Sequence, residues 1–183
     1  MSEHDDIAAE SDRLRIRLWR PDEAQRLLSI LSDWDVAQWL GDDPEPMSDL
    51  DEARQRIERY RELSTGDPRE GFWAIEVKET GVPAGSVLLI PLPNGDGELE
   101  VGWYLHPEAH GNGYASEAAR LVLARAFADG LPEVYAITHT TNASSQRVCK
   151  RIGMADLGVV RKWYDAESQC FRITREEWAA GAP

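Results

Sequence analysis

The sequence HGNGYASE, residues 110–117, joins a predicted strand to a predicted helix. Gly111 and Gly113 allow the backbone to turn sharply and to approach a ligand closely. The helix that follows begins with unpaired N–H groups and the positive end of its dipole, which suits a pyrophosphate. A glycine-rich turn before a helix is nevertheless more often only a turn. The flanking sequence has to distinguish these two interpretations.

Two other phosphate-binding motifs do not fit this stretch. A Rossmann fingerprint needs a third glycine where Ser116 stands, within a chain of repeated strand–helix units. A P-loop needs Gly-Lys-Ser or Gly-Lys-Thr, which the sequence lacks. Neither of these nucleotide-binding folds is therefore expected.

Hydrophobic periodicity and turn residues on both sides predict a mixed α/β domain. Ser48 with Asp51 resembles a capping box that starts the second helix. The predicted strands and helices are, in order, Arg13–Trp19, a helix after Pro21, a helix after Ser48, Phe72–Val77, Gly85–Leu92, Glu98–Leu105, Tyr114–Asp129, Val134–Thr138, Ala143–Ile152, Asp156–Trp163 and Cys170–Thr174. This order predicts a mixed central sheet with helices on its faces.

The length of 183 residues fits one domain, which we place at residues 13–178. Residues 1–12 are small and acidic with few apolar groups, so we expect a mobile tail there, and residues 179–183 form a C-terminal tail. No apolar run reaches the roughly 18 residues of a membrane span, and the N-terminus lacks a signal-peptide pattern. We therefore expect a cytoplasmic protein that does not bind membranes.

The formal net charge of −13 argues against nucleic-acid binding, because contacts to phosphates need clustered Lys and Arg. It favours encounter with a cationic partner such as an amine, although solubility alone also explains it. The two cysteines and four histidines show no spacing typical of a metal site, so no metal is expected.

Three ordered motifs carry a family resemblance. They are EVGWYLHP (100–107) with GNGYASEA (111–118), then NASSQRVCKRIGM (142–154), and finally RITREEW (172–178). Together they resemble the GNAT acetyltransferases, and within them the RimJ/RimL-like branch, which acetylates protein N-termini or other amines. The resemblance covers about residues 13–178. It implies a mostly antiparallel GNAT-like sheet with helices on its flanks, and acyl-CoA bound where the central parallel strands splay.

The resemblance also implies acetyl-CoA as cosubstrate, an amine acceptor as partner, and a monomer or homodimer. It assigns the pyrophosphate to backbone groups of residues 110–115 and the pantetheine arm to the strand edge 103–105, where a local bulge could open the sheet. The family usually has Gln or Arg where this chain has His110; backbone-mediated binding should tolerate the change. The expected acyl-CoA contacts are Trp103, Tyr104, Leu105, His110, Gly111, Asn112, Gly113, Tyr114, Ala115, Ser116 and Asn142.

Glu100 is the first candidate for proton transfer. In the alternating strand it shares a face with Gly102 and Tyr104, while Val101 and Trp103 share the other. Attack on a thioester requires a neutral amine, so a carboxylate acting directly or through water is chemically suitable. A solvated or salt-bridged strand glutamate is the competing interpretation. The resemblance implies that Glu100 is the catalytic base.

Asn142 and Ser145 are explained structurally as a helix cap and its first turn. Many GNAT enzymes use a tyrosine at the position of Cys149 to protonate the leaving thiolate, and that residue is cysteine here. The resemblance to RimL-like members instead implies Ser145, with Ser144 as fallback, and Asn142 as a pantetheine contact. A covalent acyl-Cys149 is disfavoured, because no histidine is placed nearby and a helical cysteine is usually a core residue.

The acceptor side falls in the segment between the early helices, where Trp34, Trp39, Asp42 and Asp43 could hold a cationic amine. Core tryptophans and solvated carboxylates are the alternative explanation. The predicted function is acetyl transfer to a primary amine, such as a protein N-terminal α-amine. The alternatives are a small-molecule amine acceptor, either an antibiotic or a polyamine, and a CoA-binding module without turnover.

Overall fold

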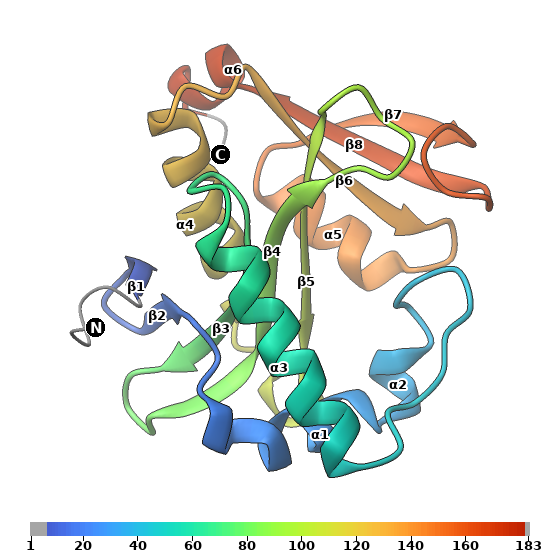
Figure 1. Ribbon diagram of the computed structural model, residues 1–183. Coiled ribbons are helices and arrows are strands. Elements are labelled where there is room, and N and C mark those ends of the chain that lie inside the picture. Colours follow the sequence, from blue (N-terminus) through green and yellow to red (C-terminus); the bar gives the residue numbers. More distant parts are fainter. Residues whose placement is uncertain (1–6, 182–183) are drawn as a thin grey trace.

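One eight-stranded sheet runs through the computed structural model, which describes residues 7–181 (Figure 1). Its strand order is β1-β2-β3-β4-β5-β6-β8-β7, and all neighbours are antiparallel except β5 and β6. The strands are β1 (Ile7–Glu10), β2 (Leu14–Arg17), β3 (Gly71–Val77), β4 (Val82–Pro91), β5 (Leu99–Leu105), β6 (Glu133–His139), β7 (Ala155–Val160) and β8 (Ser168–Thr174). The predicted mixed, mostly antiparallel sheet is confirmed.

Helices cover both faces of this sheet (Figure 1). The helices are α1 (Ala24–Leu31), α2 (Trp34–Ala37), α3 (Leu50–Thr65), α4 (Tyr114–Ala128), α5 (Ala143–Arg151) and α6 (Arg175–Ala179), with 3-10 turns at Pro21–Glu23 and Pro107–Ala109. None of the helices among residues 7–181 is long and apolar enough to cross a membrane.

The sheet separates two apolar clusters. Helix α4 packs Ala118 and Val122 against one face, together with Val101 of β5. Helices α1 and α3 pack Leu27 and Ile57 against the other face, which includes Tyr104 of β5. Burial of each large aliphatic side chain contributes about 1.5–3 kcal/mol. The predicted alternation along β5 is therefore confirmed, and it directs the face that carries Glu100 and Tyr104 toward α1 and α3.

The parallel strands β5 and β6 pair only at Glu100 and Tyr135, and diverge beyond that point. Beyond this point, the main-chain N–H and C=O groups of β5 that point away from β4 have no neighbouring strand to pair with. Buried main-chain groups without a strand partner need another hydrogen-bond partner. The register between β4 and β5 is continuous from Gly85 to Pro91, so the expected bulge is absent from this pair. The sheet opens by splaying instead, as the family resemblance implied.

The tail prediction for residues 1–12 is wrong in part. Strand β1 pairs antiparallel with β2, and Glu10 forms an ion pair with Lys78 (Oε2 to Nζ, 2.9 Å). Main-chain pairing to an edge strand needs few apolar side chains, which is why composition missed it. Residues 1–6 and 182–183 lie outside the described part of the chain. At the other end, the tail begins one residue later than predicted, because Ala179 still belongs to α6.

The capping prediction for α3 is also wrong, because the cap is Asp49. Its Oδ1 accepts hydrogen bonds from the N–H groups of Asp51 and Glu52, each at 2.9 Å. Asp33 caps the short helix α2 in the same way, accepting from the N–H of Asp35 at 2.9 Å. An aspartate N-cap satisfies helix N–H groups and complements the helix dipole.

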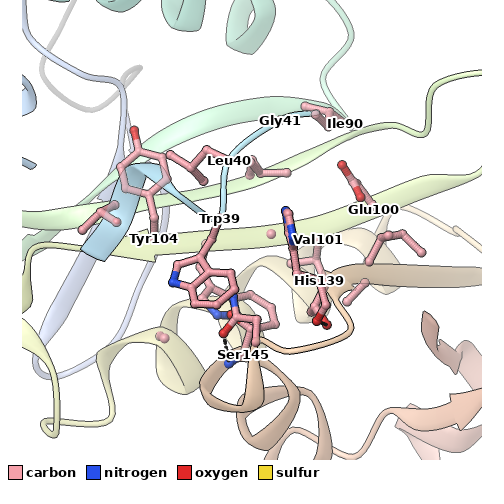
Figure 2. Close-up of a pocket in the computed structure, with 18 of the residues that line it drawn as sticks. Trp39, Leu40, Gly41, Ile90, Glu100, Val101, Tyr104, His139 and Ser145 are labelled. Atoms are coloured by element: carbon pink, nitrogen blue, oxygen red, sulfur yellow. Dashed lines mark hydrogen bonds between the residues drawn. The ribbon is translucent and has the colours of Figure 1, made fainter. Parts of the chain in front are cut away.

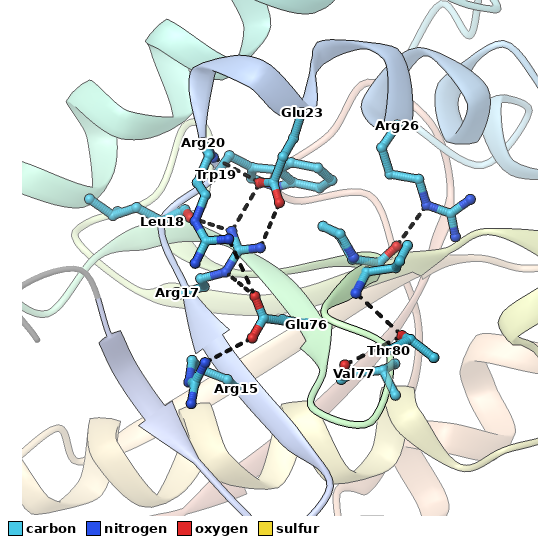
Figure 3. Close-up of polar contacts among 12 residues, drawn as sticks. Arg15, Arg17, Leu18, Trp19, Arg20, Glu23, Arg26, Glu76, Val77 and Thr80 are labelled. Carbon is cyan, nitrogen blue, oxygen red and sulfur yellow. Dashed lines mark hydrogen bonds and ion pairs between the residues drawn. The ribbon is translucent and has the colours of Figure 1, made fainter. Parts of the chain in front are cut away.

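A buried ion cluster ties β2, β3 and the turn before α1 together (Figure 3). The guanidinium of Arg17 donates to Glu76 (Nε to Oε2, 2.7 Å) and to Glu23 (Nη2 to Oε1, 2.6 Å). Its Nη1 also donates to the main-chain oxygen of Leu18 at 2.9 Å, and Arg15 supplies Glu76 with a second partner at 2.9 Å. The Arg17 side chain is only 2% exposed, so each charge depends on its partners.

Candidate active site

A cavity of about 710 Å³ lies where β5 and β6 diverge (Figure 2). It runs from the loop before α4 to the sheet face that α3 covers. The residues predicted from the sequence that line it are Trp39, Asp42, Glu100, Trp103, Tyr104, Leu105, His110, Ala115, Asn142, Ser144 and Ser145. The cavity therefore reaches from Glu100 to the edge of the expected phosphate loop, at His110 and Ala115. The other residues predicted for that loop, Gly111, Asn112, Gly113, Tyr114 and Ser116, do not line it.

The loop before α4 has the geometry of an anion site. Gly111 and Gly113 have φ angles of 80° and 78°, which a side chain would disfavour, and α4 begins immediately after Gly113. Within residues 7–181, no acceptor lies within hydrogen-bond range of the backbone N–H groups of residues 111–116. The N–H of His110 instead donates to the oxygen of Pro107 at 3.1 Å. The available donors are thus 111–116, one residue later than predicted.

Arg13 holds this loop from outside, a role that the sequence did not suggest. Its Nη2 donates to the main-chain oxygen of Asn112 at 3.2 Å, and its Nε donates to Glu117 Oε2 at 2.9 Å. The guanidinium also stacks over the ring of Tyr114, 5.2 Å from its centroid. The chain between β1 and β2 therefore fixes the start of α4.

Glu100 is buried on the floor of the cavity. Burial raises the pKa of its carboxyl from 4.5 to about 7, and a hydrogen bond donated by Tyr164 (Oη to Oε1, 2.5 Å) opposes part of that rise. A carboxylate with a pKa near neutrality is well matched to accept a proton from an amine. Tyr164, in the loop between β7 and β8, was not predicted because it lies 64 residues away in the sequence.

Replacing Tyr164 with phenylalanine should raise the pKa of Glu100 further. The lost hydrogen bond stabilises the charged carboxylate, and a bond to a charged group is worth about 1.5–3 kcal/mol, or roughly one to two pKa units. The acidic limb of the kcat/KM profile for acetyl transfer should therefore move to higher pH by about one to two units. An unshifted limb in a folded Tyr164→Phe protein would show that Tyr164 does not tune Glu100.

The other predicted catalytic residue lies at the start of α5. Asn142 Oδ1 accepts a hydrogen bond from the N–H of Ser145 at 3.1 Å, so the helix-cap interpretation of Asn142 is confirmed. Asn142 is buried and Ser145 half-buried, and both line the cavity. Cys149 points into the core, where burial raises the pKa of its thiol to about 12. A protonated core thiol does not suit an acyl-cysteine mechanism.

Of the residues predicted for the acceptor side, Trp39 and Asp42 line the cavity, and Trp34 and Asp43 do not. Helix α2 buries Val36 and Ala37, which leaves Trp34 on its outer side and 52% exposed. Trp39 makes an edge-on contact with His139, with ring centroids 5.7 Å apart. The cavity residues that the sequence did not suggest include Arg56, Arg59, Tyr60, His139, Tyr164 and Glu167.

The family model for the acetyltransferase (GNAT) domain matches residues 13–155 of this chain. The chain belongs to the GNAT acetyltransferases. This GNAT enzyme is 28% identical over 155 residues to the uncharacterised N-acetyltransferase YoaA of Bacillus subtilis, a match that covers 84% of this chain and 86% of YoaA. It is therefore an acyl-CoA-dependent acetyltransferase.

Two solved structures share the fold of this GNAT enzyme. A protein from Vibrio cholerae, provisionally assigned as a ribosomal-protein-serine acetyltransferase, has a TM-score of 0.76 at 20% identity and covers 91% of this chain and 96% of its own. The Microcin C7 self-immunity acetyltransferase MccE, in complex with acetyl-CoA and AMP, has a TM-score of 0.76 at 14% identity and covers 90% and 93%.

Proposed function

We propose that this enzyme transfers the acetyl group of acetyl-CoA to the α-amine of a peptide or protein N-terminus, as in the RimJ/RimL-like branch. The observation that carries the proposal is the cavity that holds the buried carboxylate of Glu100 and extends to His110 and Ala115, beside the free N–H groups before α4. The similarity to the Vibrio cholerae protein supports the choice of a protein acceptor.

The residues at the CoA end fit a pyrophosphate and a pantetheine arm. N–H groups of residues 111–116 at the start of a 15-residue helix would bind the pyrophosphate. Main-chain groups of β5 that face away from β4 would pair with the amides of the pantetheine arm, as a neighbouring strand does. Asn142 lies beside this path and would contact the arm.

The chemistry follows from the groups at the other end. Glu100 accepts a proton from the acceptor amine, directly or through water, and the nitrogen then attacks the carbonyl carbon of the thioester. Unpaired N–H groups of β5 stabilise the negative charge on the carbonyl oxygen. The carbon–sulfur bond breaks, and the hydroxyl of Ser145 donates to the departing sulfur.

Ser145→Ala should lower kcat by about 10- to 100-fold and leave the KM for acetyl-CoA nearly unchanged, because the hydroxyl acts on the leaving sulfur. The matched control is Ser144→Ala, one residue away on the same helix turn and also at the cavity. Steady-state release of free thiol from acetyl-CoA measures both. A larger loss in Ser144→Ala than in Ser145→Ala would transfer the role to Ser144.

Acceptor profiling tests the proposed function itself. Isotopically labelled acetyl-CoA is offered with N-terminal peptides and with small amines, and mass spectrometry locates the label while thiol release gives the rate. The proposal expects label on peptide α-amines. Label on polyamines or antibiotics alone would assign a small-molecule acceptor. Thermal stabilisation by CoA without any turnover would identify a CoA-binding module.

A further inference from the structure

Helix α3 presents a positive face to the cavity. Arg56, Arg59, Tyr60 and Leu63 line it, and their spacing places all four on one side of the helix. The helix carries four arginines and four carboxylates, yet the two charged residues that reach the cavity are both arginines. The chain as a whole has a net charge of −13, so the positive charge on this side of the cavity comes from the local placement of these two arginines and not from the overall composition.

These two charges are incompletely neutralised. In the part of the chain that the structure describes, Arg56 has one loose ion-pair partner, Glu52, with 3.7 Å between Nη2 and Oε1 and both side chains about 40% exposed. Within residues 7–181, Arg59 forms no ion pair. The wall behind them is rigid, because Tyr60 stacks on Phe72 (centroids 3.8 Å apart) and its hydroxyl lies 3.3 Å from that of Tyr104. Guanidinium groups whose charge is not fully paired beside such a wall suit a planar carboxylate.

The end of the cavity that lies away from these arginines carries negative charge. Glu100 and Tyr164 lie there. Burial raises the pKa of Tyr164 most, the carboxylate of Glu100 raises it further, and the charge of Asp42 adds a smaller effect in the same direction. The other carboxylates that line the cavity, Asp35 and Glu167, also come from elements other than α3. The floor and wall between the two ends are apolar, formed by Leu63, Phe72, Leu88 and Ile90.

The distance between the Glu100 end and the Tyr104 end of the cavity determines how long a bound peptide has to be. Glu100 and Tyr104 lie at opposite ends of the drawn part of β5 (Figure 2), four residues apart, which corresponds to about 13 Å along a strand. Burial lowers the pKa of Arg56, and its interactions with the hydroxyls of Tyr60 and Tyr104 contribute to a net rise, so its guanidinium lies near the Tyr104 end. An extended peptide spans that distance in three to four residues, at about 3.3–3.6 Å each.

We propose that the acceptor is an anionic amine, namely a peptide N-terminus with a carboxylate about three residues further on. Its α-amine lies at Glu100, its apolar part lies over Leu88 and Ile90, and its carboxylate pairs with Arg56 and Arg59. This inference rests on the proposed function and specifies which peptides the site selects.

Two tetrapeptides test it, both C-terminally amidated and identical except for glutamate or glutamine at position four. The wild-type enzyme should prefer the glutamate peptide by about 10- to 100-fold in kcat/KM, mostly through KM, because a charge-assisted pair is lost with glutamine. In the double variant Arg56→Gln, Arg59→Gln the ratio should fall to near one. The matched control is Arg54→Gln, on the same helix but paired with Asp51 outside the cavity, and it should keep the wild-type ratio.

Calorimetric binding of the same two peptides to the CoA-loaded protein separates this inference from the proposed function. A binding preference for the glutamate peptide that disappears in the double variant supports the inference even if neither peptide is turned over. Equal binding of both peptides, no binding of either, or a preference that survives the double substitution would overturn it. Turnover of both peptides at equal rates would overturn it while leaving the proposed function intact.

Discussion

Glu100→Gln is expected to lower kcat/KM for acetyl transfer by about 10²–10⁴-fold at pH 8, the range typical of a lost general base. Glutamine has nearly the same shape and still accepts the hydrogen bond from Tyr164, but its amide is not a base. Binding of acetyl-CoA should change little, because the proposed pyrophosphate donors are the unpaired backbone N–H groups of residues 111–116. Thiol release and calorimetry measure the two quantities separately.

The same substitution should stabilise the folded protein at neutral and alkaline pH. The pKa of Glu100 is about 7 in the folded protein against 4.5 as its ordinary value, so the folded state binds the proton more tightly. Stability is therefore lost as pH rises from about 4.5 to 7, by up to about 3 kcal/mol, and Gln removes this cost. Glu100→Gln should melt higher than wild type at pH 8, with the difference narrowing toward pH 4.

Glu98→Gln is the matched control for both measurements. Glu98 precedes the same strand but pairs with Lys162 (Oε1 to Nζ, 2.9 Å), which with neighbouring hydrogen bonds lowers its pKa to about 2. It does not line the cavity. A loss of activity in Glu98→Gln as large as in Glu100→Gln would argue against a specific role for Glu100.

Arg17→Met should cost about 3–5 kcal/mol of unfolding free energy, a large part of the 5–15 kcal/mol available to a typical domain. Among residues 7–181, Arg17 is the only cation that pairs with Glu23, so the substitution leaves that carboxylate without one (Figure 3). Glu76 loses one partner and keeps Arg15 at 2.9 Å. Burying a carboxylate without a cation is more costly than losing an exposed ion pair. Urea unfolding monitored by tryptophan fluorescence gives the difference.

Two further variants test the physical reason for that loss. Arg54→Met removes an arginine whose ion pair with Asp51 is exposed, and should change stability little. The double variant Arg17→Met, Glu23→Gln should recover part of the lost unfolding free energy, because the carboxylate that Arg17→Met leaves without a cation is replaced by a neutral amide. If the single and double variants were equally unstable, lost packing rather than an unpaired charge would be the cause.

The fold was predictable from the sequence where neighbouring residues form a pattern typical of a helix or a strand. Helix α4 begins at Tyr114 as predicted, because Gly113 precedes an apolar helical repeat, and β5 was placed to within one residue by its alternation. Strand β1 was missed, since an edge strand held by main-chain bonds carries little apolar signal. The cap of α3 was misplaced by one residue because Ser48 and Asp49 are both good N-cap residues.

The site was predictable only in part, for a different reason. Glu100 and Ser145 lie within motifs, so their sequence context identified them as candidates, and the structure brings both to one cavity. Tyr164 and Arg13 act on groups 64 and about 100 residues away, and no local pattern reports such a contact. In the sequence, the arginines of α3 are indistinguishable from an ordinary solvated helix face. Only the packing of α3 on the sheet shows that Arg56 and Arg59 line the cavity.

The most direct measurement is the pH profile of kcat/KM for acetyl transfer by the wild-type enzyme and Glu100→Gln. The wild-type rate should rise through an inflection near pH 7 that belongs to Glu100, in addition to the inflection of the acceptor amine itself. Glu100→Gln should be slower by about 10²–10⁴-fold and should retain only the acceptor inflection. Two profiles with the same inflections and similar rates would contradict the assignment of Glu100 as the catalytic base.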